Sequence, residues 1–297
     1  MIFSRIFFVE FDRLYHIRYK IAIQYLREIS SGANGKVFEV GREETFALKV
    51  MHSGDRSVKA QRCFYSEYEK INMLNHPNII KAFGIYLSDK NTPPSILLEF
   101  CPNDLQTFIT KSNPSNVQIV TCIYQIVEGM KYVHKCNIIH RDLKPSNILI
   151  SKNGTIRISD FGISKLMTSE EQSSTLGVGT QKFMAPEILN ELDYDEKVDI
   201  YSFGVVMFFL LNRGVMPKIT IIQVGTGKKA NIPSTFTNLS KQIINDCWNF
   251  EPQSRPSFER LLHLFESNDY MLLDLDKSEI SEVRHFVKQH KTKIPFY

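Results

Sequence analysis

Apolar and polar positions follow two different periods along the chain, and the change of period divides it into two halves. In the first half, short runs at residues 25–31, 35–40 and 46–51 combine β-branched or aromatic residues between glycine, asparagine and charged turns. Such runs are typical of antiparallel hairpins. Further strands are expected at residues 79–86 and 95–100, on either side of the turn-forming run SDKNTPPS.

One helix is expected among these strands, at residues 57–75. Its apolar residues recur at spacings of three and four, which places on one face of a helix Phe64, Tyr68, Ile71 and Leu74. Pro77 follows and is expected to stop the helix. The first half is therefore predicted to be a small antiparallel sheet with about five strands and one helix.

After Pro102 the apolar residues follow the helical period. This period predicts helices at residues 105–110, 117–136, 198–211, 239–248 and 258–265. Residues 140–161 are expected to form a loop, a short hairpin with NILI and TIRIS as its strands, and a second loop. The second half is therefore mainly helical, and the fold class predicted for the whole chain is α+β.

The two ends of the chain are set apart from this pattern. Residues 1–22 are aromatic but are interrupted by charges such as Arg5 and Glu10, and we interpret them as an N-terminal extension of unknown role. Residues 271–297 are interpreted as a charged C-terminal tail with weak helical periodicity.

Composition excludes several classes of protein. With 297 residues, of which 43% are hydrophobic and 23% charged, the chain is globular rather than disordered, collagenous or membrane-embedded. The net charge of +4 is too small and dispersed to imply a nucleic-acid partner. The most apolar stretch, residues 200–211, is shorter than the roughly 20 residues of a bilayer span, so no membrane span is expected.

The five cysteines are widely spaced and contain no C-x-x-C pair. This usage indicates neither a disulfide framework nor a zinc site. It favours a reducing compartment, and a cytoplasmic location is expected, with the nucleus as the alternative.

The most informative segment is HRDLKPSN at residues 140–147, followed by Asp160, Phe161 and Gly162. Its Asp142 and Asn147, together with Asp160, supply hard oxygen ligands that suit Mg²⁺ and can orient a hydroxyl. Isolated Asp and Asn residues in loops are usually turn formers, but eight consecutive letters followed by DFG are a specific pattern. The segment resembles the catalytic loop and the DFG motif of the eukaryotic protein kinases.

This resemblance extends over about residues 23–270, with the landmarks in the family's order. It implies a two-lobed protein kinase fold: a small antiparallel β-sheet N-lobe with one helix at about residues 23–100, and a larger, mainly α-helical C-lobe at about residues 101–270. It also implies a reaction, the transfer of the γ-phosphoryl group of ATP to protein hydroxyls, with Mg²⁺ as the ion and Mn²⁺ as an alternative.

The resemblance assigns a role to each residue of the catalytic loop. Asp142 would orient the substrate hydroxyl and accept its proton, and Lys144 would neutralise charge on the moving phosphoryl group. The metal ligands would be Asn147 and Asp160.

A glycine-rich segment, ISSGANGKV, lies upstream at residues 29–37. Its Gly32 and Gly35 have no Cβ, so a hairpin turn can lie close over phosphates. A hairpin without a ligand is the alternative reading of this segment taken alone. Ser30 stands where protein kinases usually carry their first glycine, and it is expected to alter nucleotide affinity rather than abolish binding.

Lys49 lies in FALKV, which resembles the third strand of the kinase fold, and Glu67 lies on the following helix. Two solvated charges are the usual reading of a Lys and Glu pair. The spacing of Glu67 from the HPNII turn matches the family, however, and implies that the pair holds the α- and β-phosphates.

The resemblance also places an adenine slot, with Leu98 as its gatekeeper residue. Nucleotide contacts beyond the glycine-rich segment are expected from Val37, Ala47, Leu98, the backbones of Glu99 and Cys101, and Asp104 at the ribose. The CPND linker at residues 101–104 is one residue shorter than is usual in the family.

Two pairings are expected around the activation segment, which ends in GTQKFMAPE at residues 179–187. Glu187 would form a buried bidentate pair with Arg255, and Asp199 would anchor the backbone of the catalytic loop. Arg141 is expected to meet a phosphate on this segment. The candidate acceptors and the remaining regulatory residue are Thr168, Ser169, Ser173, Ser174, Thr175 and Thr180.

Lys144 indicates the substrate class, because the catalytic loop has the sequence DLKPxN in serine/threonine kinases and in the tyrosine-kinase-like group. Thr180, in GTQKFMAPE, supports the same choice. The runs CWNFEPQSRPSF and YSFGVV resemble the tyrosine-kinase-like group most. The expected partners are ATP and protein substrates that carry Ser or Thr.

Two other functions stay open at this point. A pseudokinase scaffold would bind nucleotide without transfer, but such proteins usually lack one of Lys49, Asp142 or Asp160, and all three are present. A metabolite or antibiotic kinase on a related fold does not require the long activation segment or the MAPE run at its end. The sequence does not identify the substrate, the upstream activator or the oligomeric state.

Overall fold

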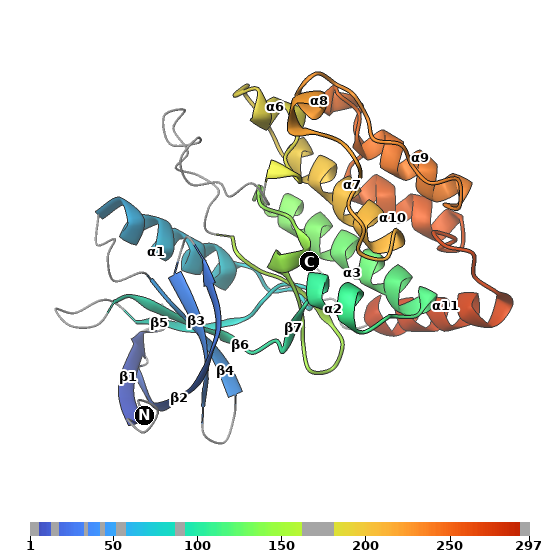
Figure 1. The fold of residues 1–297 in the computed structure, drawn as a ribbon. Helices are drawn as coiled ribbons and strands as arrows, with labels where there is room; N and C mark the ends of the chain where they lie inside the picture. The colour runs from blue at the N-terminus through green and yellow to red at the C-terminus, as the bar shows by residue number, and fades with distance from the viewer. Residues whose placement is uncertain are drawn as a thin grey trace. The chain divides into compact units, whose positions relative to one another are not determined.

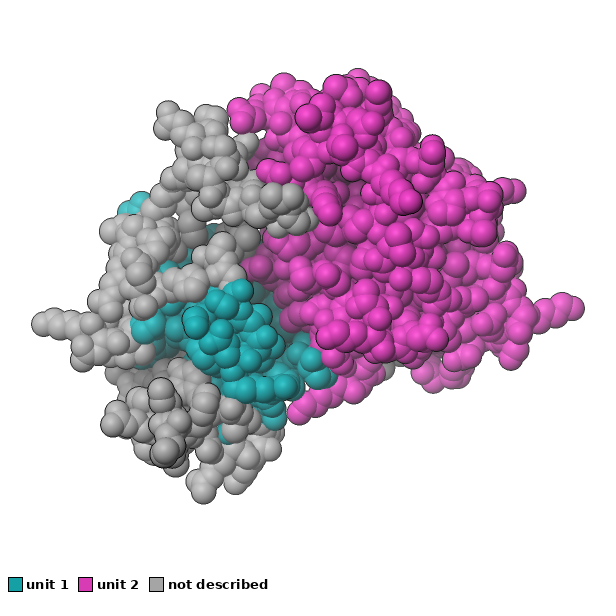
Figure 2. All heavy atoms as spheres, viewed as in Figure 1, with its two compact units in different colours: residues 1–75, 80–102, 161–166 teal, residues 76–79, 103–160, 167–297 magenta. Residues whose placement is uncertain are grey.

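The computed structural model describes residues 6–12, 18–32, 35–41, 45–51, 58–86, 93–161 and 181–291. The chain divides into two compact units (Figure 2). Unit 1 comprises Met1–Asn75, Ile80–Pro102 and Phe161–Leu166, and unit 2 comprises His76–Ile79, Asn103–Asp160 and Met167–Tyr297. Unit 1 is built from strands and one described helix, and unit 2 is mainly helical, which confirms the predicted two-lobed α+β fold (Figure 1).

The described strands of unit 1 form a closed barrel in the order β1-β2-β3-β4-β6-β5. They are β1 (Ile6–Asp12), β2 (Arg18–Gly32), β3 (Gly35–Gly41), β4 (Thr45–Val50), β5 (Ala82–Tyr86) and β6 (Ser95–Glu99). Every pairing is antiparallel. Val40, Leu48 and Leu97 form the buried centre of this barrel, and aromatic residues of β3, β4 and β5 pack against them.

The expected N-terminal extension contains a strand of this barrel. β1 pairs with the first half of β2, from Ile6 opposite Gln24 to Asp12 opposite Arg18. Asp12 also pairs with Ile85 of β5, which closes the barrel. The boundary expected between residues 22 and 23 therefore falls inside β2.

The helix of unit 1, α1 (Val58–Met73), packs against β5. The stripe that predicted it is buried, because Phe64, Tyr68, Ile71 and Leu74 are each at most 8% exposed. The helix ends at Met73, before Pro77, as expected from the missing N–H of proline.

Unit 2 contains helices and a small sheet. The helices are α2 (Leu105–Lys111), α3 (Asn116–Lys135), α6 (Pro186–Leu189), α7 (Lys197–Leu211), α8 (Ile221–Gly225), α9 (Asn238–Cys247), α10 (Phe258–Ser267) and α11 (Lys277–Lys291), with 3-10 turns at Pro145–Asn147 and Pro252–Ser254. The sheet has the order β7 (Asn103–Asp104), β8 (Ile148–Ile150), β9 (Ile156–Ile158).

Polar caps set the starts of several of these helices. Ser115 and Gln118 form a reciprocal capping box at the start of α3, and Thr237 and Ser257 accept hydrogen bonds from the first turns of α9 and α10. These caps satisfy backbone N–H groups that have no partner inside the helix. The helix boundaries therefore follow from local sequence.

Helix α7 lies at the centre of unit 2 (Figure 1), and every residue from Val198 to Leu211 is buried. A helix that is apolar all round is expected in such a position. Gly204 lets α9 approach closely, because a Cβ at this position would lie 2.7 Å from the Cβ of Cys247 and 2.9 Å from the Trp248 ring. α7 is thus the packed base on which the catalytic loop rests.

The expected charged tail is largely a helix of unit 2. α11 contacts α3 and buries Val283, Val287 and His290. These residues are spaced by four and three, so they form one narrow inner stripe on an otherwise charged helix. A reciprocal cap begins it: Asp276 Oδ1 accepts from the backbone N–H of Glu279, and Glu279 Oε2 accepts from that of Asp276.

Among the residues that the structure describes, no helix combines the length and apolarity required to cross a membrane.

Candidate active site

The first group of candidate residues lies in unit 1, where β4 carries Lys49 and α1 carries Glu67. Their charged ends are paired, with Lys49 Nζ 2.5 Å from Glu67 Oε1. Both residues are buried, at 8% and 3% exposed. A buried charge is strongly destabilising without its partner, so this pair differs from an ordinary surface salt bridge. The expected pairing is present.

The glycine-rich hairpin joins β2 to β3 in unit 1. Ser30 pairs with Val37, and Gly32 pairs with Gly35. Gly35 has φ +141, and a Cβ there would lie 2.1 Å from the carbonyl oxygen of Val50. Only glycine fits this position, since both the backbone conformation and the available space exclude a side chain. Ser30 is exposed.

Three expected adenine-slot residues lie on adjacent strands of unit 1. Ala47 of β4 is directly opposite Leu98 of β6, and both are buried. Val37 of β3 is half-buried and lies directly opposite Lys49. The sheet register therefore brings these residues to neighbouring positions.

Glu99 is the last residue of β6, and Cys101 follows it by two positions. The N–H of Glu99 donates to the carbonyl of Lys81 at 2.8 Å, so this N–H is already used inside unit 1. Its carbonyl is the group that fits the expected role. Cys101 is buried in the same unit.

Asp104 has a structural role that the sequence reading did not include. It is the N-cap of α2, and its Oδ1 accepts from the backbone N–H of Thr107 at 2.7 Å. Its Oδ2 accepts from Thr107 Oγ1 at 3.1 Å. Both oxygens therefore hold the first turn of α2, and a ribose hydroxyl would have to share them.

In unit 2 the catalytic loop holds Asp142 by one of its two oxygens. Asp142 Oδ2 accepts from Lys144 Nζ at 2.7 Å and from Asn147 Nδ2 at 2.8 Å. Asn147 Nδ2 also donates to the carbonyl of Asp142 at 2.9 Å. Asp142 Oδ1 accepts no hydrogen bond within the described part of the chain. The carboxylate is therefore fixed in orientation with one oxygen left over.

Ser159, the residue before Asp160, is hydrogen-bonded to Asn147 and so links the two expected metal ligands. The carbonyl of Asn147 accepts from both the backbone N–H and the Oγ of Ser159, each at 2.9 Å. Asp160 follows directly and has φ +68, a conformation that non-glycine residues adopt mostly at sites held by their surroundings.

The donor set at this place fits Mg²⁺. The described residues contain no cluster of three or more His, Cys, Asp or Glu side chains that could hold a metal by themselves. Mg²⁺ is usually bound by one or two carboxylates together with substrate phosphates. Asp160 supplies one carboxylate to this pattern. Asn147 supplies an amide oxygen, which accepts no hydrogen bond from a described residue.

Asp199 of α7 anchors the backbone of the catalytic loop. It is completely buried, and its two oxygens accept from the backbone N–H groups of His140 at 2.8 Å and Arg141 at 2.7 Å. His134 Nε2 lies 2.9 Å from Asp199 Oδ2 and must donate to it. The expected anchoring role is present, and His134 is an additional partner.

Arg141 is oriented toward a residue that the sequence reading missed. Its guanidinium lies over the ring of Tyr194, 5.1 Å from the ring centroid, and its Nε is buried without a hydrogen-bond partner among the described residues. The expected phosphate acceptors, and Thr180, lie outside the described residues. Arg141 thus has an unused donor and φ +68.

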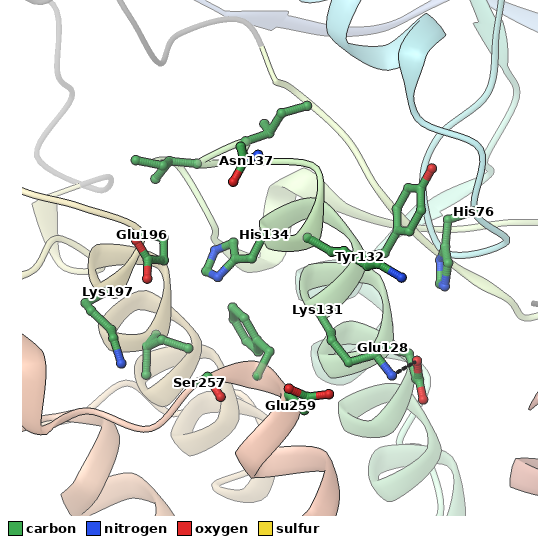
Figure 3. A pocket seen from close by; sticks show the side chains of 15 residues that line it. His76, Glu128, Lys131, Tyr132, His134, Asn137, Glu196, Lys197, Ser257 and Glu259 are labelled. Atoms are coloured by element: carbon green, nitrogen blue, oxygen red, sulfur yellow. Dashed lines mark ion pairs between the residues drawn. The ribbon is translucent and has the colours of Figure 1, made fainter. Parts of the chain in front are cut away.

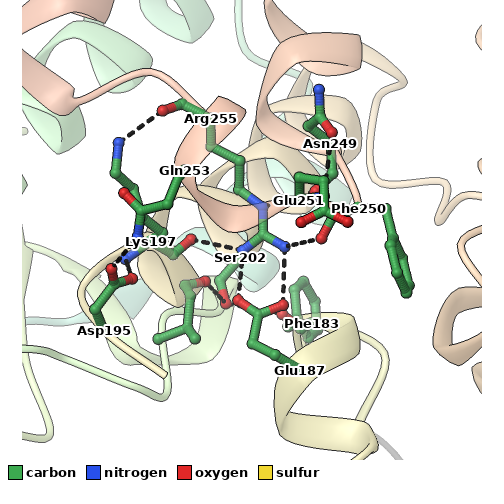
Figure 4. Close-up of polar contacts among 11 residues, drawn as sticks. Phe183, Glu187, Asp195, Lys197, Ser202, Asn249, Phe250, Glu251, Gln253 and Arg255 are labelled. Carbon is green, nitrogen blue, oxygen red and sulfur yellow. Dashed lines mark hydrogen bonds and ion pairs between the residues drawn. The ribbon is translucent and has the colours of Figure 1, made fainter. Parts of the chain in front are cut away.

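Arg255 and Glu187 form the expected bidentate pair (Figure 4), with Nη1 and Nη2 of Arg255 donating to the carboxylate at 2.6 and 2.8 Å. The remaining N–H groups of Arg255 donate to the carbonyls of Asn249, Lys197 and Phe250. All five donors of the guanidinium are therefore satisfied. This residue fixes Glu187, the last residue of the run GTQKFMAPE.

A hollow of about 850 Å³ lies in unit 2 beside the C-terminal half of α3 (Figure 3). It is lined by residues of α3, α7 and α10, including His134. Both signs of charge line it, and Lys131 is paired with Glu128 at 3.1 Å. Because His134 binds Asp199, this hollow borders the support of the catalytic loop.

The protein kinase domain model matches residues 23–265 of the chain. This covers most of the chain, and the chain therefore belongs to the protein kinase family. The landmark residues and the two-unit fold agree with this membership.

Relatives of the chain carry protein kinase names. It is 35% identical over 285 residues to mitogen-activated protein kinase kinase kinase 12 of Rattus norvegicus, which covers 91% of this chain and 30% of that protein. It is 32% identical over 231 residues to serine/threonine-protein kinase CTR1 of Arabidopsis thaliana, covering 73% of this chain and 28% of that protein.

A third relative is serine/threonine/tyrosine-protein kinase HT1 of Arabidopsis thaliana, 28% identical over 259 residues, covering 82% of this chain and 65% of that protein. The chain thus spans less than two thirds of the length of each of these relatives. They include members of the tyrosine-kinase-like group, which confirms the predicted resemblance.

Proposed function

We propose that this chain transfers the γ-phosphoryl group of ATP to serine and threonine hydroxyls of protein substrates. The observation that carries the proposal is the state of Asp142. Its Oδ2 is held by Lys144 and Asn147, while its Oδ1 accepts no hydrogen bond in the described parts of the chain. A carboxylate fixed by one oxygen and available at the other is suited to orient a hydroxyl.

In this proposal Asp142 Oδ1 accepts the hydrogen bond of the substrate hydroxyl and then its proton. Phosphoryl transfer needs little covalent chemistry from the protein, so catalysis consists mainly of positioning and charge neutralisation. Lys144, whose Nζ lies 2.7 Å from Asp142 Oδ2, supplies a positive charge beside the transferred group.

Asn147 and Asp160 would hold Mg²⁺, which, when bound, neutralises charge on the nucleotide phosphates. Lys49, which is paired with Glu67 in a buried position, would bind the phosphates that are not transferred. The proposal requires the groups in unit 1 and those in unit 2 to act on the same nucleotide.

The choice of serine and threonine is supported by Lys144 within DLKPSN and by the names of the relatives. Two of the relatives described above are called serine/threonine- or serine/threonine/tyrosine-protein kinases. The inference to this chain is a proposal because the chain spans only part of their length.

A transfer assay with labelled ATP, Mg²⁺ and a degenerate peptide library tests the proposal. We expect label on peptides, with phosphoserine and phosphothreonine as the products. Asp160→Ala serves as the matched control, and it should lose transfer together with affinity for Mg²⁺-nucleotide, because a carboxylate ligand is removed. Chiefly phosphotyrosine would refute the substrate class. A nucleotide-dependent thermal shift without any incorporation would instead favour a pseudokinase scaffold.

We further propose that phosphorylation between residues 168 and 175 raises activity. The supporting observation is Arg141, whose buried Nε has no hydrogen-bond partner among the described residues and is free to donate to a phosphate. The acceptor hydroxyls are Thr168, Ser169, Ser173, Ser174 and Thr175, with Ser174 and Thr175 favoured.

Alanine replacements at these five hydroxyls, singly and together, test this regulation. We expect the variant without any of the five to lose most of the activity of phosphorylated enzyme, because the phosphate that orders the segment cannot form. Mass spectrometry of the active enzyme identifies the acceptor. Full activity in the variant that lacks all five hydroxyls would show that Arg141 needs no phosphate here.

A further inference from the structure

The inner face of α11 reaches a buried loop of unit 2 through one histidine. His290 is 4% exposed, and its Nε2 lies 2.7 Å from Oδ1 of Asn78, which is completely buried. The two residues are 212 positions apart in the chain. A polar contact buried between such distant segments is retained only when both groups are satisfied.

The direction of this hydrogen bond follows from the other contacts of Asn78. Its Nδ2 donates to Gln125 Oε1 at 3.1 Å and to the carbonyl of Ile156 at 3.2 Å. Both amide donors are therefore used, and the Oδ1 is the acceptor side. His290 must carry its proton on Nε2 and donate it.

Asn78 and Gln125 together hold strand β9 at both ends. The backbone N–H of Ile158 donates to the carbonyl of Asn78 at 2.8 Å, and that of Ile156 donates to Gln125 Oε1 at 3.0 Å. Asp160 follows Ile158 by two residues. The position of β9 therefore determines where the chain enters the loop that carries Asp160.

The close approach of these segments depends on Gly129 of α3. A Cβ at this position would lie 2.7 Å from Cδ1 of Ile158 and 3.1 Å from Cβ of Asn78. Glycine in a helix interior is disfavoured relative to alanine. Its presence here is explained by the space that β9 and Asn78 occupy.

Aromatic rings hold the His290 side chain in place. The Phe286 ring stacks on it, with centroids 5.6 Å apart and an interplanar angle of 12°, and the Tyr124 ring meets it edge-on at 6.0 Å. Tyr124 is itself fixed by a hydrogen bond from its hydroxyl to Glu128 Oε1 at 3.2 Å. The imidazole therefore has little freedom to leave Asn78.

A second histidine contacts the backbone of the same asparagine. His76 Nδ1 accepts from the backbone N–H of Asn78 at 3.1 Å. Burial, followed by the charges of His290, Lys131 and Arg157, lowers the pKa of His76 to about 3. His76 is therefore a neutral acceptor at physiological pH, and Asn78 is hydrogen-bonded to two imidazoles.

We propose that His290 of α11 is a positioning residue for Asp160. It acts through Asn78 and β9, so that a helix that follows the kinase landmarks in the sequence takes part in placing a metal ligand. The inference rests on the proposed function, in which Asp160 holds Mg²⁺. It assigns to α11 a role in the reaction that packing alone would not give it.

Hydrogen exchange tests the structural half of the proposal in the full chain without nucleotide or metal. His290→Leu removes the donor at nearly constant volume, and we expect the amide of Ile158 to exchange about tenfold faster, which corresponds to about 1.4 kcal/mol. His290→Gln should restore the original rate, because its amide nitrogen is as far from Cα along the side chain as Nε2 of histidine. His285→Leu, on the exposed side of α11, is the matched control and should change nothing at Ile158.

Metal dependence tests the functional half. Titration of Mg²⁺ in the presence of a non-hydrolysable ATP analogue should show about tenfold weaker Mg²⁺ affinity in His290→Leu, the lower end of the range for losing a group that orients a metal ligand, with His290→Gln restored. If His290→Leu fails to fold, His290→Asn takes its place, because its amide is too short to reach Asn78.

Two outcomes would overturn the proposal: unchanged exchange at Ile158, or unchanged Mg²⁺ affinity despite faster exchange. The second would leave α11 with a packing role only. Because these measurements need no phosphoryl transfer, they remain readable if the wild-type chain binds nucleotide without transferring phosphate, a result that would contradict the proposed function alone.

Discussion

Asp142→Asn is expected to lower the rate of phosphoryl transfer by about two to four orders of magnitude, the usual contribution of a general base. The amide oxygen of asparagine can accept the hydrogen bond of a substrate hydroxyl, but it cannot take up the proton. The contacts of Asp142 Oδ2 with Lys144 and Asn147 must also be rearranged, since an amide nitrogen cannot accept from either donor.

Nucleotide affinity should change little in the same variant, because the proposed nucleotide contacts reside in other residues. Single-turnover transfer and binding of a fluorescent ATP analogue separate the two quantities. Asp193→Asn, at an exposed aspartate of the same unit, makes the same chemical change and should leave both unchanged. Retained turnover in Asp142→Asn would remove Asp142 from the proposed mechanism.

The paired charges of the site could be predicted from the sequence because short motifs fix their register. Lys49 in FALKV and Glu67 before the HPNII turn are buried together, and Glu187 in MAPE meets Arg255. Each of these residues lies within a run of letters that specifies a local backbone. Each run then places one charge at a defined point of a known fold.

Residues that act through long-range packing were missed for the opposite reason. α11 contains only three buried residues among charged neighbours, so its periodicity is weak, and nothing near His290 in sequence indicates Asn78. The spacing of Val283, Val287 and His290, together with the Asp276 and Glu279 cap, was the available signal. It predicts a one-sided helix but does not identify what that side covers.

Asp104 and Arg141 show a related limit. Asp104 caps helix α2 through Thr107, and local sequence could have predicted this cap. The family resemblance instead assigned Asp104 to the ribose. The partner that the structure gives Arg141, Tyr194, lies 53 positions further along the chain, and only the fold brings the two together. The cap formed by Asp104 could be predicted from neighbouring residues, whereas the contact of Arg141 with Tyr194 depends on the tertiary fold.

Arg255→Met is expected to lower the free energy of unfolding by about 3–5 kcal/mol, because it leaves Glu187 buried without a counter-charge. Arg255 is 2% and Glu187 5% exposed, so solvent cannot replace the lost donors. Three backbone carbonyls, those of Asn249, Lys197 and Phe250, would lose their hydrogen bonds as well. Urea unfolding at neutral pH measures the effect, and Arg260→Met on the exposed side of α10 is the matched control, expected to change stability little.

The double variant Arg255→Met with Glu187→Met separates the charge from the packing. If the unpaired carboxylate dominates, the double variant should recover a substantial part of the stability that Arg255→Met loses, since replacing both partners of a buried pair by apolar residues is often close to neutral. Recovery should stay incomplete, because the three carbonyls still lack donors. A double variant as unstable as Arg255→Met would show that those carbonyl contacts, rather than the pair with Glu187, are the main contribution of Arg255, and it would reassign the stability of this segment to the loop at residues 249–255.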